Sequence, residues 1–448
     1  MNPEQQSNSM TLGRRHFLRN LGLVGGAVSI AGTGMALSGC QPSSNTANNA
    51  SASSTANAAN AELGTKDSNK NANPKHAGSD ANSSKHGFAD AKYEFYGEHQ
   101  AGITTPSQRQ IYFLVMDLHT NDVEAVKQMF QDWTAFAAKL TQGNNIKDYG
   151  TNPYVPPTDT GEADNLGAYG LTLTFGVSRS FLTKLGLGNK LPKEFKDLPA
   201  FPRDQIRGNL SGGDICIQAC AEDAQVAFHA VRQLVRQARS TITMRWSQSG
   251  FVGYDTGNET PRNLFGFKDG TANQETLKAA DKFLWANEPN WLKGGTYLVA
   301  RVIQMHLETW DRTSLKGQEE TFGRHRTTGA AIGKQAEFDS FDVNEKATNG
   351  KAVIPEISHM GLSKRTGTQI LRRSYSYSSG IDAKTGQFDA GLLFISFQKS
   401  PEQFITIQNA LGRVDKMNEY ITHIGSGLFA CFGGVKPGEY LGQALFEG

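Results

Sequence analysis

The residues best suited to chemistry lie in one stretch, where a single acid stands between glycines in an apolar, aromatic run. Residues 262–273 are Arg-Asn-Leu-Phe-Gly-Phe-Lys-Asp-Gly-Thr-Ala-Asn, so Asp269 is followed by Gly270. Burial among apolar side chains disfavours a charged carboxylate, and a neighbouring glycine lets a large partner approach the main chain. The pattern favours an acid that transfers protons beside a bulky ligand. An ordinary turn is the alternative, because Asp-Gly pairs are common in turns.

The elements that must position this acid recur in the same order in both parts of the chain. Apolar runs typical of strands cover 110–118, 171–175, 215–219 and 242–247, and helical spacing covers 122–140 and 224–239. A second series has strand patterns at 296–308 and 391–398 and a helical pattern at 401–411. The repetition predicts an α+β fold made of two ferredoxin-like halves around one site.

Residues 1–40 have the features of an export signal. Residues 13–19, Gly-Arg-Arg-His-Phe-Leu-Arg, form a twin-arginine signature, and a glycine-interrupted apolar run at 21–37 is too weak to span a bilayer well. Residues 37–40, Leu-Ser-Gly-Cys, resemble a bacterial lipobox, which predicts a lipid on Cys40 and an envelope or periplasmic location. Cleavage elsewhere, with Cys40 inside the signal, is the alternative. Twin-arginine export carries folded proteins, which hints at a prosthetic group.

The rest of the chain divides into a tether and a large domain. Residues 41–90 are rich in Ser, Asn, Ala, Lys and Gly, and this composition predicts a flexible tether. Residues 91–448 are long enough for one domain with halves at about 91–260 and 261–448.

Charge and cysteine spacing exclude other classes of protein. A formal net charge of +2 gives no reason to expect a nucleic-acid partner. Cys216 and Cys220 have neither the spacing of a zinc pair nor that of a redox CxxC motif, so they are expected to be small buried residues. A disulfide is the alternative, because an exported location permits one.

Several segments resemble the dye-decolourising haem peroxidases. Residues 266–270, Gly-Phe-Lys-Asp-Gly, match the GxxDG signature of that family, and further family segments follow in family order at 308–313, 322–324, 358–359, 370–377, 389–394 and 420–427. The resemblance covers essentially 93–448 and is strongest to the twin-arginine-exported deferrochelatase/peroxidase branch, often associated with ferrous iron uptake. It implies two ferredoxin-like halves of the dimeric α/β-barrel type that enclose a pocket for haem b.

The resemblance assigns the central roles to three residues. His359 would be the axial ligand of the haem iron. Asp269 would move a proton between the two oxygens of hydrogen peroxide, and Arg372 would stabilise the developing negative charge. Arg373 is the adjacent alternative to Arg372.

Further contacts with haem are implied by the same segments. Gly270, Thr271 and Ala272 would line the haem edge, and Asp389 is a candidate to orient His359 through its second ring nitrogen. Lys364 and Arg365 either meet the haem propionates or are solvated loop charges. The segment between His359 and Arg372 is shorter than in several relatives, which leaves the propionate contacts open.

Two functional classes follow from this resemblance. The first is an enzyme that reduces hydrogen peroxide and oxidises organic donors, with release of iron from haem as a related activity. The second is an envelope haem- or iron-handling binding protein in which turnover is incidental; storage alone has no need of the Asp269 and Arg372 pair. Family members are often homodimers, so a homodimer is expected. Trp310, Tyr375 and Tyr377 are either core residues or relays of electrons.

Overall fold

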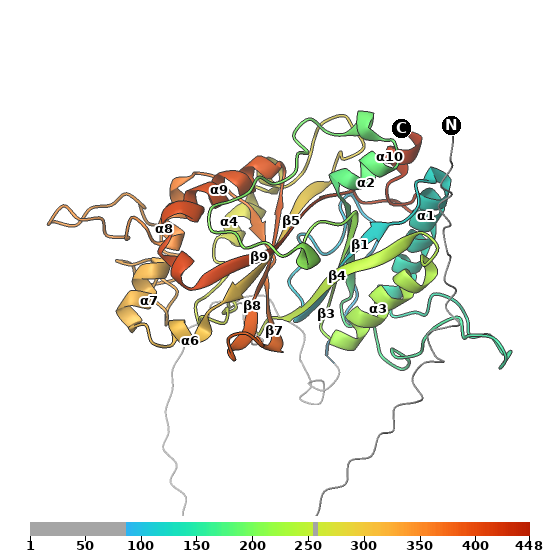
Figure 1. Ribbon diagram of the computed structural model, residues 1–448, viewed down its shortest axis with the longest axis horizontal. Helices are drawn as coiled ribbons and strands as arrows, with labels where there is room; N and C mark the ends of the chain where they lie inside the picture. Colours follow the sequence, from blue (N-terminus) through green and yellow to red (C-terminus); the bar gives the residue numbers. More distant parts are fainter. Residues whose placement is uncertain (1–86, 254–258) are drawn as a thin grey trace, which may run out of the picture. The chain divides into compact units, whose positions relative to one another are not determined.

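The computed structural model describes residues 87–253 and 259–448 (Figure 1). The predicted export signal at 1–40, and nearly all of the predicted tether at 41–90, lie outside the described residues. None of the helices in the described ranges is both long and apolar enough to cross a membrane.

The described strands form one sheet that closes on itself. The order is β5-β9-β2-β3-β1-β4-β7-β8-β6, and β5 also pairs with β8, so eight strands make a ring while β6 pairs with the end of β8. All pairings between these strands are antiparallel. The strands are β1 (Gln110–Leu118), β2 (Thr172–Val177), β3 (Ile215–Ala221), β4 (Ile242–Phe251), β5 (Thr296–Met305), β6 (Leu371–Arg372), β7 (Tyr375–Ile381), β8 (Phe388–Gln398) and β9 (Ile421–Cys431).

The predicted repeat of two ferredoxin-like halves is confirmed by the strand order. In the first half, β2-β3-β1-β4 lie side by side, and α1 (Val123–Leu140) and α3 (Ala224–Gln237) make the crossovers. In the second half, β7-β8-β5-β9 repeat that order, and α9 (Pro401–Val414) leads from β8 to β9. The halves join where β4 meets β7 and where β2 meets β9.

One short helix, α2, follows β2 in the first half, and the other short helices lie in the second half or at the C-terminus. The short helices are α2 (Arg179–Lys184), α4 (Asn273–Lys278), α5 (Ala280–Phe283), α6 (Leu307–Trp310), α7 (Leu315–Phe322), α8 (His359–Arg365) and α10 (Gln443–Glu447). The strand expected at 296–308 ends earlier, because β5 stops at Met305 and α6 begins at Leu307. Figure 1 shows α1 and α3 at one end of the molecule and α7, α8 and α9 at the other.

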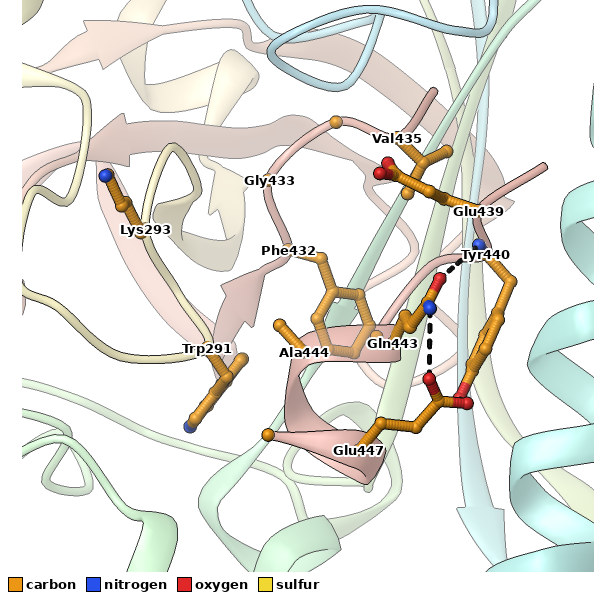
Figure 2. A pocket seen from close by; sticks show the side chains of 13 residues that line it. Trp291, Lys293, Phe432, Gly433, Val435, Glu439, Tyr440, Gln443, Ala444 and Glu447 are labelled. Carbon is orange, nitrogen blue, oxygen red and sulfur yellow. Dashed lines mark hydrogen bonds between the residues drawn. The ribbon is translucent and has the colours of Figure 1, made fainter. Parts of the chain in front are cut away.

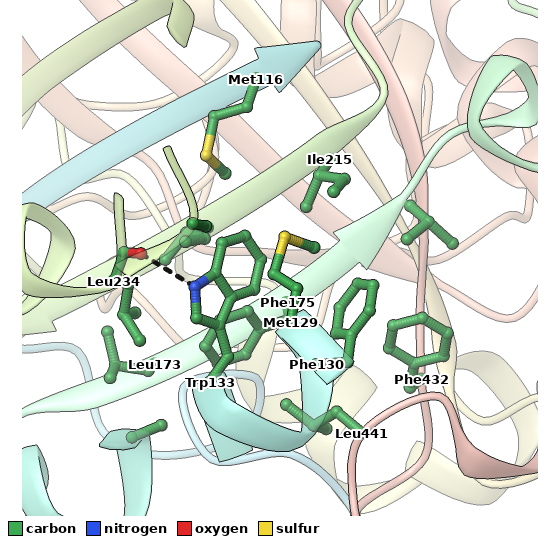
Figure 3. Close-up of a cluster of buried hydrophobic side chains, with 14 of the residues drawn as sticks. Met116, Met129, Phe130, Trp133, Leu173, Phe175, Ile215, Leu234, Phe432 and Leu441 are labelled. Atoms are coloured by element: carbon green, nitrogen blue, oxygen red, sulfur yellow. Dashed lines mark hydrogen bonds between the residues drawn. The ribbon is translucent and has the colours of Figure 1, made fainter. Parts of the chain in front are cut away.

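The largest apolar cluster packs the helices of the first half onto the outer face of the sheet. Asp122 and Asp223 cap α1 and α3 by accepting bonds from main-chain N–H groups. Trp133 of α1 is fully buried beside Phe130 and Phe175, and its Nε1 donates to the carbonyl of Leu234 in α3 at 2.9 Å (Figure 3). This bond satisfies the one polar atom of the indole inside the core.

A second cluster fills the inside of the barrel, and two smaller clusters lie on the outer face of the second half. Alternate residues of strands from both halves, among them Phe113, Leu298 and Leu393, meet in the interior. Cys216 and Cys220 are buried and free, as the sequence predicted, and Cys431 is buried and free as well. Outside the barrel, Ile303 and Leu392 pack against the segment that holds Asp269. The candidate site is therefore built on the outer face of the second half.

Candidate active site

An aromatic cluster anchors the hairpin that precedes the acid. Phe267 stacks on Phe322 with ring centres 3.9 Å apart, and Phe265 packs against Trp310 at 4.5 Å. Trp310 Nε1 donates to the carbonyl of Phe265 at 3.1 Å. The aromatic side chains that precede Asp269 are thus packed in a small core, and this packing holds the tip of the hairpin in place.

Asp269 faces an arginine, and this differs from the apolar surroundings that the sequence suggested. Its Oδ1 accepts a bond from Arg372 Nη1 at 2.6 Å, and Asn263 Nδ2 approaches its Oδ2 at 3.4 Å. The side chain of Asp269 is 17% exposed and that of Arg372 is 27% exposed, so they line an accessible part of the structure. Gly270, at φ +120°, takes a backbone conformation that suits glycine and turns the chain directly after the acid.

Arg372 and Arg373 point to opposite faces because they are neighbours in an extended segment. Arg372 meets Asp269. Arg373 is 4% exposed, and its guanidinium donates to the carbonyls of Thr105 and Pro106 in the first half. Of the two arginines that the sequence left open, Arg372 is therefore the one that contacts Asp269.

His359 begins α8, directly after the buried residue Ser358. Its Nδ1 lies 2.7 Å from Oδ2 of Asp415, and the other oxygen of Asp415 accepts the N–H of Met417 at 2.9 Å. Burial lowers the pKa of His359, but the charge and hydrogen bond of Asp415 outweigh it, so that pKa lies above its ordinary value. A carboxylate on Nδ1 fixes the tautomer and leaves Nε2 as the ring nitrogen that could bind a metal. The His359 side chain is 34% exposed, and Nε2 carries no hydrogen bond to any described residue.

The prediction that Asp389 orients His359 was wrong. Asp389 lies on β8, where its charge raises the pKa of Tyr377 in addition to the larger effect of burial. Asp415, instead, contacts the ring of His359. The main-chain N–H of Lys416 donates to the carbonyl of Ile357, and this bond holds the end of α9 next to the start of α8. The sequence offered a weak signal, namely an acid that caps the 3-10 helix Lys416–Glu419.

The remaining predicted contacts are engaged in other ways. Lys364 forms an exposed ion pair with Glu275 at 2.8 Å. Arg365 donates to the carbonyls of Glu356 and Val343, so it fastens the segment before α8. Thr271 Oγ1 donates to the carboxylate of Glu337 in the same segment, and Ala272 stands at the N-cap position of α4 without a side-chain bond there. Trp310, Tyr375 and Tyr377 are all buried.

Arg324 is a cation of the site that the sequence reasoning overlooked. Its Nη1 donates to the carbonyls of Gly329 and Glu337 at 2.6 Å and 3.4 Å. Burial lowers the pKa of Arg324, and the nearby charge of Arg372 lowers it further. No carboxylate of the described ranges forms an ion pair with it. The segment 322–324 was considered in the sequence only for its place in the family order, although the charge of Arg372 acts on its arginine.

A separate hollow of about 400 Å³ lies near the C-terminus (Figure 2). Trp291, Phe432 and Tyr440 line it, together with Gln443, which donates to Glu447 at 3.0 Å. Its lining includes none of the predicted site residues, so it has no part in the site around His359.

Comparisons with known proteins identify the family of the chain. Residues 100–252 match the family described as "Dyp-type peroxidase, N-terminal", and residues 260–436 match "Dyp-type peroxidase, C-terminal". The chain is 38% identical over 378 residues to the "Deferrochelatase" of Escherichia coli (strain K12), which covers 80% of this chain and 88% of the relative. It is 39% identical over 378 residues to the "Deferrochelatase" of Shigella sonnei (strain Ss046), with the same coverage.

Solved structures give the same result. "Ferric DtpA from Streptomyces lividans" is 35% identical with a TM-score of 0.75, and the match covers 81% of this chain and 99% of that chain. The "Dye-decolorizing protein from V. cholerae", at 18% identity and a TM-score of 0.54, shares the fold and covers 74% of this chain and 96% of that chain. The chain therefore belongs to the Dyp-type peroxidase family, and it is a haem peroxidase.

Proposed function

We propose that His359 is the axial ligand of haem b and that Asp269 and Arg372 act on hydrogen peroxide. Bound haem supplies the redox-active iron at which peroxide is reduced and organic donors are oxidised. The residues present fit this group. Nε2 of His359 is free to ligate. Arg324 is a half-buried guanidinium that forms no ion pair with the described residues, although the charges of Glu337 and Glu275 act on it from a longer distance, so a propionate could pair with it directly.

The two oxygens of Asp269 have different tasks in this proposal. Oδ1 is held by Arg372 at 2.6 Å, whereas Oδ2 is met only at 3.4 Å by Asn263 among the described residues. Oδ2 is therefore the oxygen that takes a proton from the incoming peroxide and returns it to the oxygen that leaves as water. Arg372 stays protonated at any working pH and stabilises the negative charge that develops on the leaving oxygen.

The ion pair between Asp269 and Arg372 carries this proposal, and an isosteric variant tests it. We expect Asp269→Asn to bind haem with an unchanged Soret band and to react with hydrogen peroxide about 100-fold or more slowly in stopped-flow measurements. Asp197→Asn is the matched control, since it alters an exposed ion pair with Arg179 elsewhere in the fold. Unchanged peroxide reactivity in Asp269→Asn would remove the acid from the mechanism.

The same measurement separates the enzyme from a haem- or iron-handling binding protein. A binding protein would retain haem through His359 and show no dependence of the peroxide reaction on Asp269. A His359→Ala variant should lose the wild-type Soret band in either case, because the axial ligand is absent.

We also infer that the chain releases iron from haem and serves ferrous iron uptake. The support is the name "Deferrochelatase" of relatives at 38–39% identity. The test incubates the protein with haem and a reductant and measures the fluorescence of metal-free porphyrin. No rise above a protein-free control would reject iron release.

Export, anchoring and assembly are further parts of the proposal. The twin-arginine signature supports export, and Cys40 supports a lipid anchor in the cell envelope. Replacing Arg14 and Arg15 by lysine should leave the protein in the cytoplasm, and Cys40→Ala should release it from the membrane fraction. A homodimer is expected for the folded domain, and light scattering of the purified protein tests it.

A further inference from the structure

Glu337 is a buried acid that faces the segment of Asp269 without touching Asp269 itself. It lies between α7 and α8 and is 8% exposed. Lys268 Nζ donates to its Oε2 at 2.7 Å, and Thr271 Oγ1 donates to its Oε1 at 2.8 Å. These donors stand one residue before and two residues after Asp269, so a single carboxylate holds the acid segment on both sides.

We propose that Glu337 is a positioning residue that fixes Asp269 for its reaction with peroxide. The inference rests on the proposed role of Asp269. Glu337 cannot itself transfer the proton, since both of its oxygens accept bonds from side chains that flank Asp269. It acts by holding those side chains, and through them the short stretch of main chain between them.

The need for such a tie follows from the backbone. Gly270 directly follows the acid and has a φ of +120°, and glycine restricts the backbone less than any other residue does. The aromatic cluster anchors only the preceding tip of the hairpin, at Phe265 and Phe267. A shift of about 1 Å at a reacting group can lower a rate 100-fold. In the stretch from Lys268 to Thr271, the main-chain N–H of Asp269 donates to the carbonyl of Pro261 at 2.8 Å. Glu337 adds the side-chain contacts on either side of that bond.

The segment that carries Glu337 also contacts the hairpin of residues 262–268 at a second place. Arg262 donates to the carbonyls of Arg326 and Thr327 at 2.6 Å and 2.9 Å. At Gly329, an added Cβ would stand 2.7 Å from Cδ of Lys268, so the stem of that lysine lies directly on the glycine. The 324–337 segment thus contacts both strands of the acid hairpin.

The ion pair of Lys268 and Glu337 is buried enough for its loss to be felt. The two side chains are 13% and 7% exposed. Removal of one partner leaves an uncompensated charge in a poorly solvated place. Burial raises the pKa of Glu337, but bonds from Lys268, Thr260 and Thr271 outweigh it and hold that pKa below its usual range. The carboxylate is therefore ionised when the enzyme works.

A double-variant cycle tests whether Glu337 acts through Asp269. In the haem-loaded protein, Glu337→Gln should retain the wild-type haem content and Soret band and react with hydrogen peroxide about 10- to 100-fold more slowly. The double variant Asp269→Asn/Glu337→Gln should be no slower than Asp269→Asn alone. Equal losses in both backgrounds would overturn the proposal, because Glu337 would then act independently of the acid.

A matched control variant and a second test variant separate the effect of Glu337 from a general effect on the segment or on folding. Glu345→Gln breaks the exposed pair with Lys334 on the same segment and should leave the rate unchanged. If Glu337→Gln does not fold, Lys268→Met removes one donor at similar volume, and it should also slow the reaction only when Asp269 is present. A normal rate in Lys268→Met would count against the proposal.

A readout without haem complements the kinetics. In the haem-free protein, an amine-specific reagent should modify Lys268 several-fold faster in Glu337→Gln than in the wild type, as measured by peptide mass spectrometry. Lys316, 86% exposed, provides the internal reference. An unchanged rate of modification at Lys268 would overturn the proposal that Glu337 holds this side chain in place. If Asp269→Asn itself leaves the peroxide rate intact, the proposed function fails first; if it slows the rate and Glu337→Gln does not, only the present inference fails.

Discussion

Asn273 holds the main chain of Arg372 with both ends of its side-chain amide. Its Nδ2 donates to the carbonyl of Arg372 at 2.6 Å, and the N–H of Arg372 donates to its Oδ1 at 3.0 Å. The two residues are 99 positions apart in the chain. Strand β6 and the acid segment are thus joined independently of the ion pair between Arg372 and Asp269. The pair is preorganised by main-chain geometry, which limits the rearrangement needed during reaction.

The first prediction concerns this amide. An aspartate at position 273 has the same shape but only acceptor atoms, so it would face the carbonyl of Arg372 without a donor. We expect Asn273→Asp to lower the free energy of unfolding of the haem-free protein by about 1–3 kcal/mol and to slow the peroxide reaction. Urea unfolding and stopped-flow absorbance measure the two effects. Asn290→Asp is the control, since only its Oδ1 is used, by Leu292 N–H, and neither quantity should change there.

The second prediction concerns the carboxylate behind His359. Both oxygens of Asp415 accept bonds, one from His359 and one from Met417, and an asparagine can serve only one of these donors. We expect Asp415→Asn to weaken haem binding by about 10- to 100-fold, the usual cost of losing a partner that orients a ligand. Titration of the haem-free protein with haem measures this. Asp389→Asn should bind haem as the wild type does, and the reverse pattern would restore the assignment made from sequence.

The sequence predicted the architecture well because the spacing of apolar residues and the order of strands and helices can both be read from the chain alone. The strand pattern at 110–118 coincides with β1, and the helical pattern at 122–140 ends with α1 at Leu140. Segments of mixed polarity were harder. Strand β6 has two residues, and its extended conformation is set by pairing with Phe397 and Ser396 of β8.

The site was predictable where a motif carries the chemistry and unpredictable where distant segments meet. Asp269 and Arg372 were identified from motifs, and the structure joins them by an ion pair. Asp415 was missed because it is 56 residues from His359 in the chain. The two residues meet only because α9 packs beside α8. Glu337 stands in a segment of mixed charge, and only the fold shows that its carboxylate is buried.

The third prediction concerns the barrel wall. Gly176 of β2 is paired with Cys216 of β3 and with Cys431 of β9. A Cβ at this position would lie 3.0 Å from Sγ of Cys216, 3.1 Å from Sγ of Cys431 and 3.0 Å from Cβ of Phe429. We expect Gly176→Ala to destabilise the fold by about 1–3 kcal/mol, because the added methyl overpacks the interior. Urea unfolding measures the loss. Gly188→Ala, where no atom lies within 4 Å of the added Cβ, should stay close to the wild type.

The last prediction concerns His423, a buried histidine of β9 whose charge the fold disfavours. Burial is the main cause, and the charges of Arg301 and His359 add to it, so the pKa of His423 falls to about 3. Asp204 lies 3.8 Å from its Nδ1 but is paired with Arg301 at 2.5 Å, which leaves little of its charge to favour an imidazolium. In the unfolded chain, this group has a pKa of about 6.5.

The sign of the effect on stability follows from these two values. Between about pH 6.5 and pH 3, the unfolded chain binds a proton at position 423 that the folded protein does not bind, so the free energy of unfolding falls as the pH falls. The loss attributable to this group is several kcal/mol, at most about 5 kcal/mol. Urea unfolding of the haem-free protein between pH 4 and pH 7 should therefore show a shallower dependence on pH in His423→Gln than in the wild type. Identical slopes would mean that the folded protein accepts the proton at His423 as readily as the unfolded chain does.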